Sequence, residues 1–221
     1  MIVYGSSLSP FVRKLLVICA EKGIEVENRV AGPGAPPPEG FLEASPFRKI
    51  PAIDDDGFTL SDSSAIAHYL EAKYPEPRLI PQEPQARGRA VWFDEFCDTI
   101  VFASGVKVFF NRVVGPLVGL PHDVSVAEKV EAEEVPEHLA YLDKVAPETG
   151  WLVGEDFSLA DAAVGSVLVN LQLAGCKVCE ETYPRLTAYL ARAHARPSLK
   201  SILESNHAFI DSVKDRLKLA A

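Results

Sequence analysis

The sequence lacks several features that define particular classes of protein. Only four of its 221 residues are cysteines, at positions 19, 97, 176 and 179, too few and too unevenly spaced for a disulfide framework. We interpret them as free thiols in a reducing compartment and expect a cytoplasmic protein. Lys and Arg number 22 against 31 Asp and Glu, a net charge of −9 that argues against nucleic acid as a partner.

Long apolar runs and metal-ligand patterns are also missing. The first nine residues have neither a basic start nor a long apolar core, so no secretory signal is predicted. The most apolar stretch, 160–176, contains Asp161, Asn170 and Gln172 and is shorter than the ~20 residues that span a bilayer. We interpret it as a buried helix and expect no membrane partner. The five histidines show no ligand spacing, so no metal site is predicted.

The first 75 residues have the pattern of a small mixed α/β unit. An apolar strand at 2–4 precedes a turn-rich segment and a helical period that ends near Gly23. Residues 24–30 alternate like a half-buried strand, before a stretch rich in Pro and Gly at 32–40. Two short runs, 51–53 and 58–60, flank a hairpin turn and precede another helical period. This order predicts a mixed sheet with helices packed on it.

The rest of the chain has the pattern of a helical domain. Four prolines between residues 75 and 84, with no periodicity, indicate a linker. Helices are expected at 85–113, 125–146, 158–174, 183–195 and 198–219. We therefore predict an α/β domain at 1–75, a linker at 76–86 and an all-helical domain at 87–221. A Cys-x-x-Cys pair, Cys176 and Cys179, follows a late helix, and we interpret it as structural because redox pairs lie at the start of a βαβ unit.

Ser9 and Pro10 form a helix-start signal. Pro is pre-organised for the first helical position and Ser directly before it is a preferred N-cap, so the simplest interpretation is a cap alone. The hydroxyl can also accept from a helix N–H while it donates its own proton outward to an anion. Such a charge-assisted bond, worth about 1.5 to 3 kcal/mol, would favour the ionised form of a bound acid by about one to two pKa units.

Asp62 and Ser63 open the third helix and again allow two interpretations. An acidic residue and a hydroxyl are typical caps for the first N–H groups of a helix. The same groups also match the head of an amino acid, because the helix end attracts a carboxylate and the Asp62 carboxylate attracts an ammonium.

Pro51 begins a strand, with Ile50, Lys49 and Arg48 before it. A trans peptide is the commoner state. A cis peptide would turn the N–H and C=O of Ile50 outward, where they can pair with an extended ligand backbone. Lys49 and Arg48 would then meet a second carboxylate, or remain ordinary solvated side chains.

Three motifs together resemble the cytosolic glutathione transferase superfamily. They are residues 8–14 (LSPFVRK), 45–52 (SPFRKIPA) and 60–70 (LSDSSAIAHYL), in this order. Residues 151–161 (WLVGEDFSLAD) are similar to the family's helical-domain signature, in which Ser158 and Asp161 form a capping box, and 195–198 (ARPS) also fit. The resemblance implies an α/β thioredoxin-like N-terminal domain, an all-α C-terminal domain and, as is common in the family, a homodimer.

The resemblance also implies a glutathione site in the first domain. Ser9 lies where the serine-type members, of which the phi and tau classes are most similar, hold the thiolate. Ile50 would pair with the cysteinyl backbone before a cis Pro51, and Asp62 and Ser63 would hold the γ-glutamyl head.

Two departures from the family pattern concern the charged ends of glutathione. Relatives often bind the glycyl carboxylate with a Lys or His from the loop before the proline motif, whereas residues 31–46 contain no basic residue. That leaves Lys49, with or without Arg48, for this contact. Asp62 is also shorter than the Glu or Gln frequently found there, so the ammonium contact would need a water molecule.

The leading hypothesis is an alkyl/aryl transferase of the detoxifying kind, in which the thiolate attacks a small hydrophobic electrophile and Ser9 stabilises the nucleophile. An electrophile pocket is expected around Leu8, Phe11, Phe102, Val106 and Phe109, although aromatics at helical spacing also fit an interdomain core. One alternative is a glutathione-dependent reductase or isomerase; relatives that reduce thiols carry Cys in place of Ser9. Another is a non-catalytic glutathione-binding or protein-interaction module.

Overall fold

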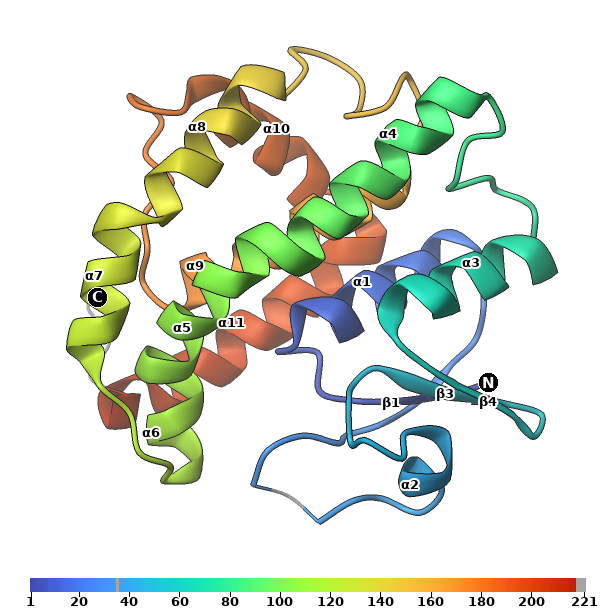
Figure 1. The fold of residues 1–221 in the computed structure, drawn as a ribbon, viewed down its shortest axis with the longest axis horizontal. Coiled ribbons are helices and arrows are strands. Elements are labelled where there is room, and N and C mark those ends of the chain that lie inside the picture. Colours follow the sequence, from blue (N-terminus) through green and yellow to red (C-terminus); the bar gives the residue numbers. More distant parts are fainter. Residues whose placement is uncertain (35, 218–221) are drawn as a thin grey trace.

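A four-stranded mixed sheet with helices on both faces forms the N-terminal part of the computed structural model, which describes residues 1–34 and 36–217 (Figure 1). Its strands lie in the order β2-β1-β3-β4 and comprise β1 (Ile2–Tyr4), β2 (Glu27–Arg29), β3 (Ala52–Asp55) and β4 (Phe58–Ser61). Strand β1 is parallel to β2 and antiparallel to β3, which is antiparallel to β4. Helices α1 (Pro10–Glu21) and α3 (Ser63–Lys73) cover one face and α2 (Phe41–Ala44) lies on the other (Figure 1). The thioredoxin-like prediction is confirmed.

The remaining residues are helical, as predicted. A continuous run from Pro84 to Val118, the long helix, contains two π-helical turns and comprises α4 (Pro84–Glu95), η1 (Phe96–Val101), α5 (Phe102–Phe109), η2 (Phe110–Val114) and α6 (Gly115–Val118). It is followed by α7 (Val124–Glu133), α8 (Val135–Val145), α9 (Leu159–Leu173), α10 (Pro184–His194) and α11 (Pro197–Leu217).

Several boundaries differ from the sequence prediction, and two of them trace to proline. The expected helix at 125–146 is split because Pro136, in the first turn of α8, has no N–H to continue α7. The long helix instead continues through Pro116, where η2 loosens the preceding turn. Helix α2 was not predicted, β2 is shorter than expected, and the predicted helix end at Leu219 lies outside the described residues.

Helix α9 is the central helix of the molecule. Fourteen of its 15 residues are buried, which confirms the prediction of a buried helix. Ser158 and Asp161 form the predicted capping box at its start, and Tyr189 donates a further hydrogen bond of 2.9 Å to Asp161. Helices α1 and α9 pack against each other, and Val3 and Ile53 of the sheet belong to one hydrophobic core with the helical part, whereas Tyr4 and Ala52 pack with α2 in a separate cluster. Helix α1 therefore packs the first domain against the helical part.

The long helix is apolar and long enough, by length and composition alone, to cross a membrane. Core helices pass the same test. This one packs on α9 and carries Asp94, which is 1% exposed and ion-paired with Lys14 of α1. We interpret it as a core helix.

The four cysteines all lie in the described part of the chain and are free thiols, as predicted. Burial, assisted by the negative charge of Glu131, raises the pKa of the Cys176 thiol to about 12. Such a thiol is almost wholly protonated at neutral pH, which favours the structural interpretation of the Cys-x-x-Cys pair.

Candidate functional site

A cavity of about 380 Å³ lies at the N-terminal end of α3, between the first domain and the long helix. It is lined by Phe11, Lys49, Ile50, Asp62, Ser63, Ser64, Glu95, Asp98 and Thr99. The lining includes four of the residues expected to bind glutathione, although they come from two separate segments of the sequence. It also includes Phe11, which was expected in the electrophile pocket.

Ser9 lies at the start of α1, but it caps the helix with its backbone only. Its carbonyl accepts a 2.9 Å bond from the N–H of Arg13, whereas its side chain makes no cap hydrogen bond. The idea of Ser9 as a side-chain cap is therefore wrong. The half-buried hydroxyl is left free to donate to a ligand beside the positive end of the helix. Ser9 is not among the residues that line the cavity.

Asp62 is the residue that caps α3. One oxygen, Oδ1, accepts 3.0 Å hydrogen bonds from the N–H groups of Ser64 and Ala65. The second oxygen accepts no hydrogen bond from the described residues and is available to a ligand ammonium. Asp62 has a φ of 89°, which costs a non-glycine residue backbone strain, and such strain is often kept at binding sites.

The loop before β3 presents Ile50 and Lys49 to the cavity. Ser45 is buried and holds this loop: its hydroxyl donates to the Lys49 carbonyl at 2.7 Å and accepts from the Lys49 N–H at 2.8 Å. The Ile50–Pro51 peptide is cis, as the resemblance implied. Among the described residues the backbone of Ile50 has no hydrogen-bond partner, so both groups are available to a ligand. Lys49 lines the cavity and Arg48 does not.

Three cavity residues from the long helix, Glu95, Asp98 and Thr99, were not predicted. They are distant in sequence from the motifs and belong to no recognisable pattern. Asp98 lies beneath the start of α3, where its Oδ2 accepts from the Ser63 hydroxyl at 3.2 Å and from the Ser64 hydroxyl at 3.3 Å. The end of the cavity near α3 is thus acidic and suits a ligand ammonium.

A buried lysine supports this acidic end. The ammonium of Lys14, on α1, lies 2.5 Å from Asp94 and 2.9 Å from Asp98. Although burial opposes it, the charges of these carboxylates raise the pKa of Lys14. Burial, with the neighbouring charge of Asp94, raises the pKa of Asp98. The Ser64 hydroxyl also donates to Asp94 at 2.8 Å, so the network joins α1, α3 and the long helix.

Of the residues expected to line the electrophile pocket, only Phe11 lines the cavity, and Phe102 is in contact with it. The rings of Phe11 and Phe102 touch, with centroids 4.5 Å apart and a 54° tilt. Leu8, three residues before Phe11, is half-buried, and Val106 is 36% exposed on α5. Phe109 is buried in the main core and is not part of the cavity lining.

Models of two protein domains match this chain. The model of the glutathione S-transferase N-terminal domain matches residues 3–78, and that of the glutathione S-transferase C-terminal domain matches 121–206. Rat glutathione S-transferase theta-1 is 32% identical over 186 residues, covering 80% of this chain and 74% of the relative. Mouse maleylacetoacetate isomerase is 29% identical over 192 residues, 84% of each chain.

Solved structures agree with the sequence relatives. A glutathione S-transferase from Methylobacillus flagellatus KT, solved with GSH bound, is 32% identical with a TM-score of 0.76, and the match covers 91% of this chain and 98% of that one. The two domain models match in the order in which the sheet and the helices occur here. The chain belongs to the glutathione S-transferase family.

Proposed function

We propose that this protein is a serine-type glutathione transferase that joins the thiolate of glutathione to a small hydrophobic electrophile. The observation that carries the proposal is the convergence of Ile50, Asp62 and Ser63 on one cavity that Phe11 of α1 also lines, two residues after Ser9, whose side chain makes no cap bond. A free thiol has a pKa near ~8.5, so a transferase working near neutral pH must favour its ionised form.

Glutathione would lie extended across the cavity. Its γ-glutamyl carboxylate meets the N–H of Ser63 at the positive end of α3, because Asp62 already occupies the next two N–H groups, and its ammonium meets the free oxygen of Asp62, with Glu95 and Asp98 nearby. Its cysteinyl backbone pairs with Ile50 as an added strand would. Its glycyl carboxylate meets Lys49, the only basic residue among those that line the cavity in the described part of the chain.

The thiol would then lie near Ser9. The Ser9 hydroxyl donates a hydrogen bond to the sulfur, and the positive end of α1 further stabilises the negative charge of the thiolate. The electrophile approaches from the side of Phe11 and Phe102, whose paired rings offer an apolar wall. The sulfur attacks the electrophilic carbon, the leaving group departs with its electron pair, and Ser9 itself forms no covalent bond.

The test is conjugation of glutathione to a chloronitrobenzene acceptor by the wild type and by Ser9→Ala. Loss of one charge-assisted hydrogen bond, about 1.5 to 3 kcal/mol, predicts a kcat/KM roughly 10 to 100 times lower. Ser6→Ala is the matched control, because the Ser6 hydroxyl accepts only a weak 3.3 Å bond from the N–H of Leu8. Wild-type protein without conjugating activity, or an unchanged Ser9→Ala variant, would refute the proposal.

The similarity to maleylacetoacetate isomerase favours a second candidate, a glutathione-dependent isomerase. An isomerase does not consume glutathione, whereas a transferase consumes one molecule for each molecule of product. Measuring the loss of free thiol alongside the turnover of each substrate therefore separates the two candidates. Retention on immobilised glutathione without either activity would indicate a non-catalytic binding module.

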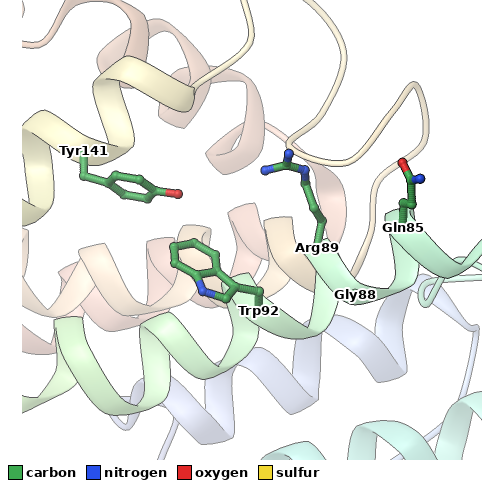
Figure 2. A pocket seen from close by; sticks show the side chains of 5 residues that line it. All are labelled: Gln85, Gly88, Arg89, Trp92 and Tyr141. Carbon is green, nitrogen blue, oxygen red and sulfur yellow. The ribbon is translucent and has the colours of Figure 1, made fainter.

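We further propose that the protein is a cytoplasmic homodimer. A second hollow, of about 440 Å³, opens on the outer surface between α4 and α8 and is lined by Gln85, Gly88, Arg89, Trp92 and Tyr141 (Figure 2). The rings of Trp92 and Tyr141 lie edge-on at 5.5 Å, and Trp92 is 45% exposed. An exposed tryptophan in a hollow is typical of a protein interface.

An aromatic side chain on the other domain would fit this hollow. Phe47, in the loop before Pro51, is 86% exposed, the highest value among the large apolar side chains of the described residues. We propose that Phe47 of a second copy fills the hollow. Light scattering after gel filtration should show a dimer for the wild type and a monomer for Phe47→Ser and for Trp92→Ser. A monomeric wild type would refute the dimer, and two dimeric variants would refute this contact.

A further inference from the structure

The side chain of Arg13, one turn into α1, is completely buried. Its guanidinium donates to Asn206 Oδ1 at 3.1 and 3.0 Å, from Nε and Nη2. Nη1 donates to the carbonyl of Ser166 at 2.7 Å and to Asn170 Oδ1 at 2.9 Å. Every one of these acceptors is neutral, and no carboxylate of the described residues pairs with Arg13.

The same side chains hold the loop that leads to Ser9. Asn170, on α9, donates to the carbonyl of Leu8 at 3.1 Å, and Nη2 of Arg13 lies 3.5 Å from that carbonyl. Asn206, on α11, donates to the hydroxyl of Ser7 at 2.8 Å. Residues from two helices of the C-terminal part thus fix the two residues that precede Ser9.

The other charged groups around this network do not balance the guanidinium. His194, on α10, donates from Nε2 to the carbonyl of Gly165 on α9 at 3.1 Å, and burial lowers its pKa, with the positive charge of Arg13 adding to the effect. His207, on α11, lies close enough to act on His194 in the same direction. The carboxylates nearest to α1 on the side of the long helix, Asp94 and Asp98, are bonded to Lys14.

An unbalanced buried charge is costly to a fold. Burial lowers the pKa of Arg13 to about 9, because it disfavours the charged form, but the guanidinium remains protonated at neutral pH. Both amide partners, Asn170 and Asn206, have the shape of aspartate, and a single amide-to-carboxylate change at either would supply a counter-ion. Because these partners are neutral, the positive charge of Arg13 is not compensated by the protein and can stabilise the negative charge of a bound ligand.

We propose that Arg13 is a positioning residue that stabilises the glutathione thiolate indirectly, through its unbalanced charge and through the loop that it holds behind Ser9. This inference rests on the proposed function. The guanidinium does not touch the ligand; it acts across the carbonyl of Leu8, in a low-dielectric interior where charges interact over longer distances than in water. Helices α9 and α11 thereby contribute to the acidity of a thiol bound in the other domain.

The test is the pKa of the thiol of bound glutathione, followed by thiolate absorbance near 240 nm as the pH is varied. Asn206→Asp keeps the shape and both contacts to Arg13 but cancels its charge. For one charge roughly 10 Å from the sulfur and an effective dielectric constant of about 20 to 40, the thiol pKa should rise by about 0.6 to 1.2 units. Asn206→Ala, which leaves the charge in place, is the matched control and should raise it by less.

The outcomes separate the two proposals. A bound thiol with its ordinary pKa in the wild type would overturn the proposed function. A lowered wild-type pKa that Asn206→Asp leaves unchanged would overturn only the role of Arg13. If Asn206→Asp fails to fold, Asn170→Asp supplies the same charge but loses the bond to the Leu8 carbonyl, so Asn170→Ala is its control; a thiol pKa that is no higher in Asn170→Asp than in Asn170→Ala would also overturn it.

Discussion

Replacing Lys14 with methionine should strongly destabilise the protein. Methionine has a similar length and no charge, so the change removes the ammonium from between Asp94 and Asp98. The side chains of Lys14 and Asp94 are each 1% exposed and that of Asp98 is 18% exposed, so water cannot replace the lost partner of Asp94 and reaches Asp98 only from the cavity. Removing one member of a buried ion pair costs about 3 to 5 kcal/mol.

The pH dependence of this effect has a definite sign. The pKa of Asp98 is already raised by burial and by Asp94, and removing Lys14 raises it further. A carboxyl group with a raised pKa in the folded state binds protons more readily there than in the unfolded chain, so folding becomes less favourable as the pH rises through that range. The stability difference between the wild type and Lys14→Met should be largest near neutral pH and should narrow as the pH falls towards the unfolded value of about 4.

Urea unfolding followed by far-ultraviolet circular dichroism, at several pH values, measures this difference. For a chain of this size the expected loss corresponds to a melting temperature roughly 6 to 20 °C lower. The triple variant Lys14→Met, Asp94→Asn, Asp98→Asn removes all three charges and should recover most of the loss. A loss below about 1 kcal/mol for Lys14→Met, or a stability difference that widens at low pH, would show that Lys14 does not stabilise the fold through Asp94 and Asp98.

Two further predictions concern the charged ends of glutathione. Asp62→Asn keeps an oxygen to cap α3 but removes the charge, so glutathione should bind about 10 times more weakly with little change in stability. Asp62→Ala should lose the same affinity and also lower the free energy of unfolding by about 1 kcal/mol. Equal melting temperatures for the two variants would contradict the capping role of Asp62. Lys49→Ala should raise the KM for glutathione about 10-fold while Arg48→Ala leaves it unchanged, and steady-state kinetics that show the reverse order would place the clamp at Arg48.

Much of the fold was predictable because its signals are local. The helix start at Pro10, the hairpin before α3 and the capping box of Ser158 and Asp161 each depend on neighbouring residues. Proline inside a helical pattern was less predictable, because Pro136 breaks a helix and Pro116 does not. The outcome depends on whether the preceding turn can loosen, which the sequence does not specify.

Only those residues of the candidate site that belong to the sequence motifs were predictable. Residue chemistry allowed a cis peptide before Pro51 and an ammonium contact at Asp62, and the resemblance to a family favoured both. Glu95 and Asp98 reach the cavity only because the long helix packs beside α3, and no sequence period reveals that contact. The cap role assigned to the Ser9 side chain failed because a helix start can be capped by backbone geometry alone.

A crystal structure with glutathione bound would test the central claim most directly. The sulfur should lie within hydrogen-bonding distance of the Ser9 hydroxyl, with the γ-glutamyl head at Asp62 and Ser63 and the glycyl carboxylate at Lys49. A sulfur atom directed away from Ser9, or glutathione bound outside this cavity, would contradict it.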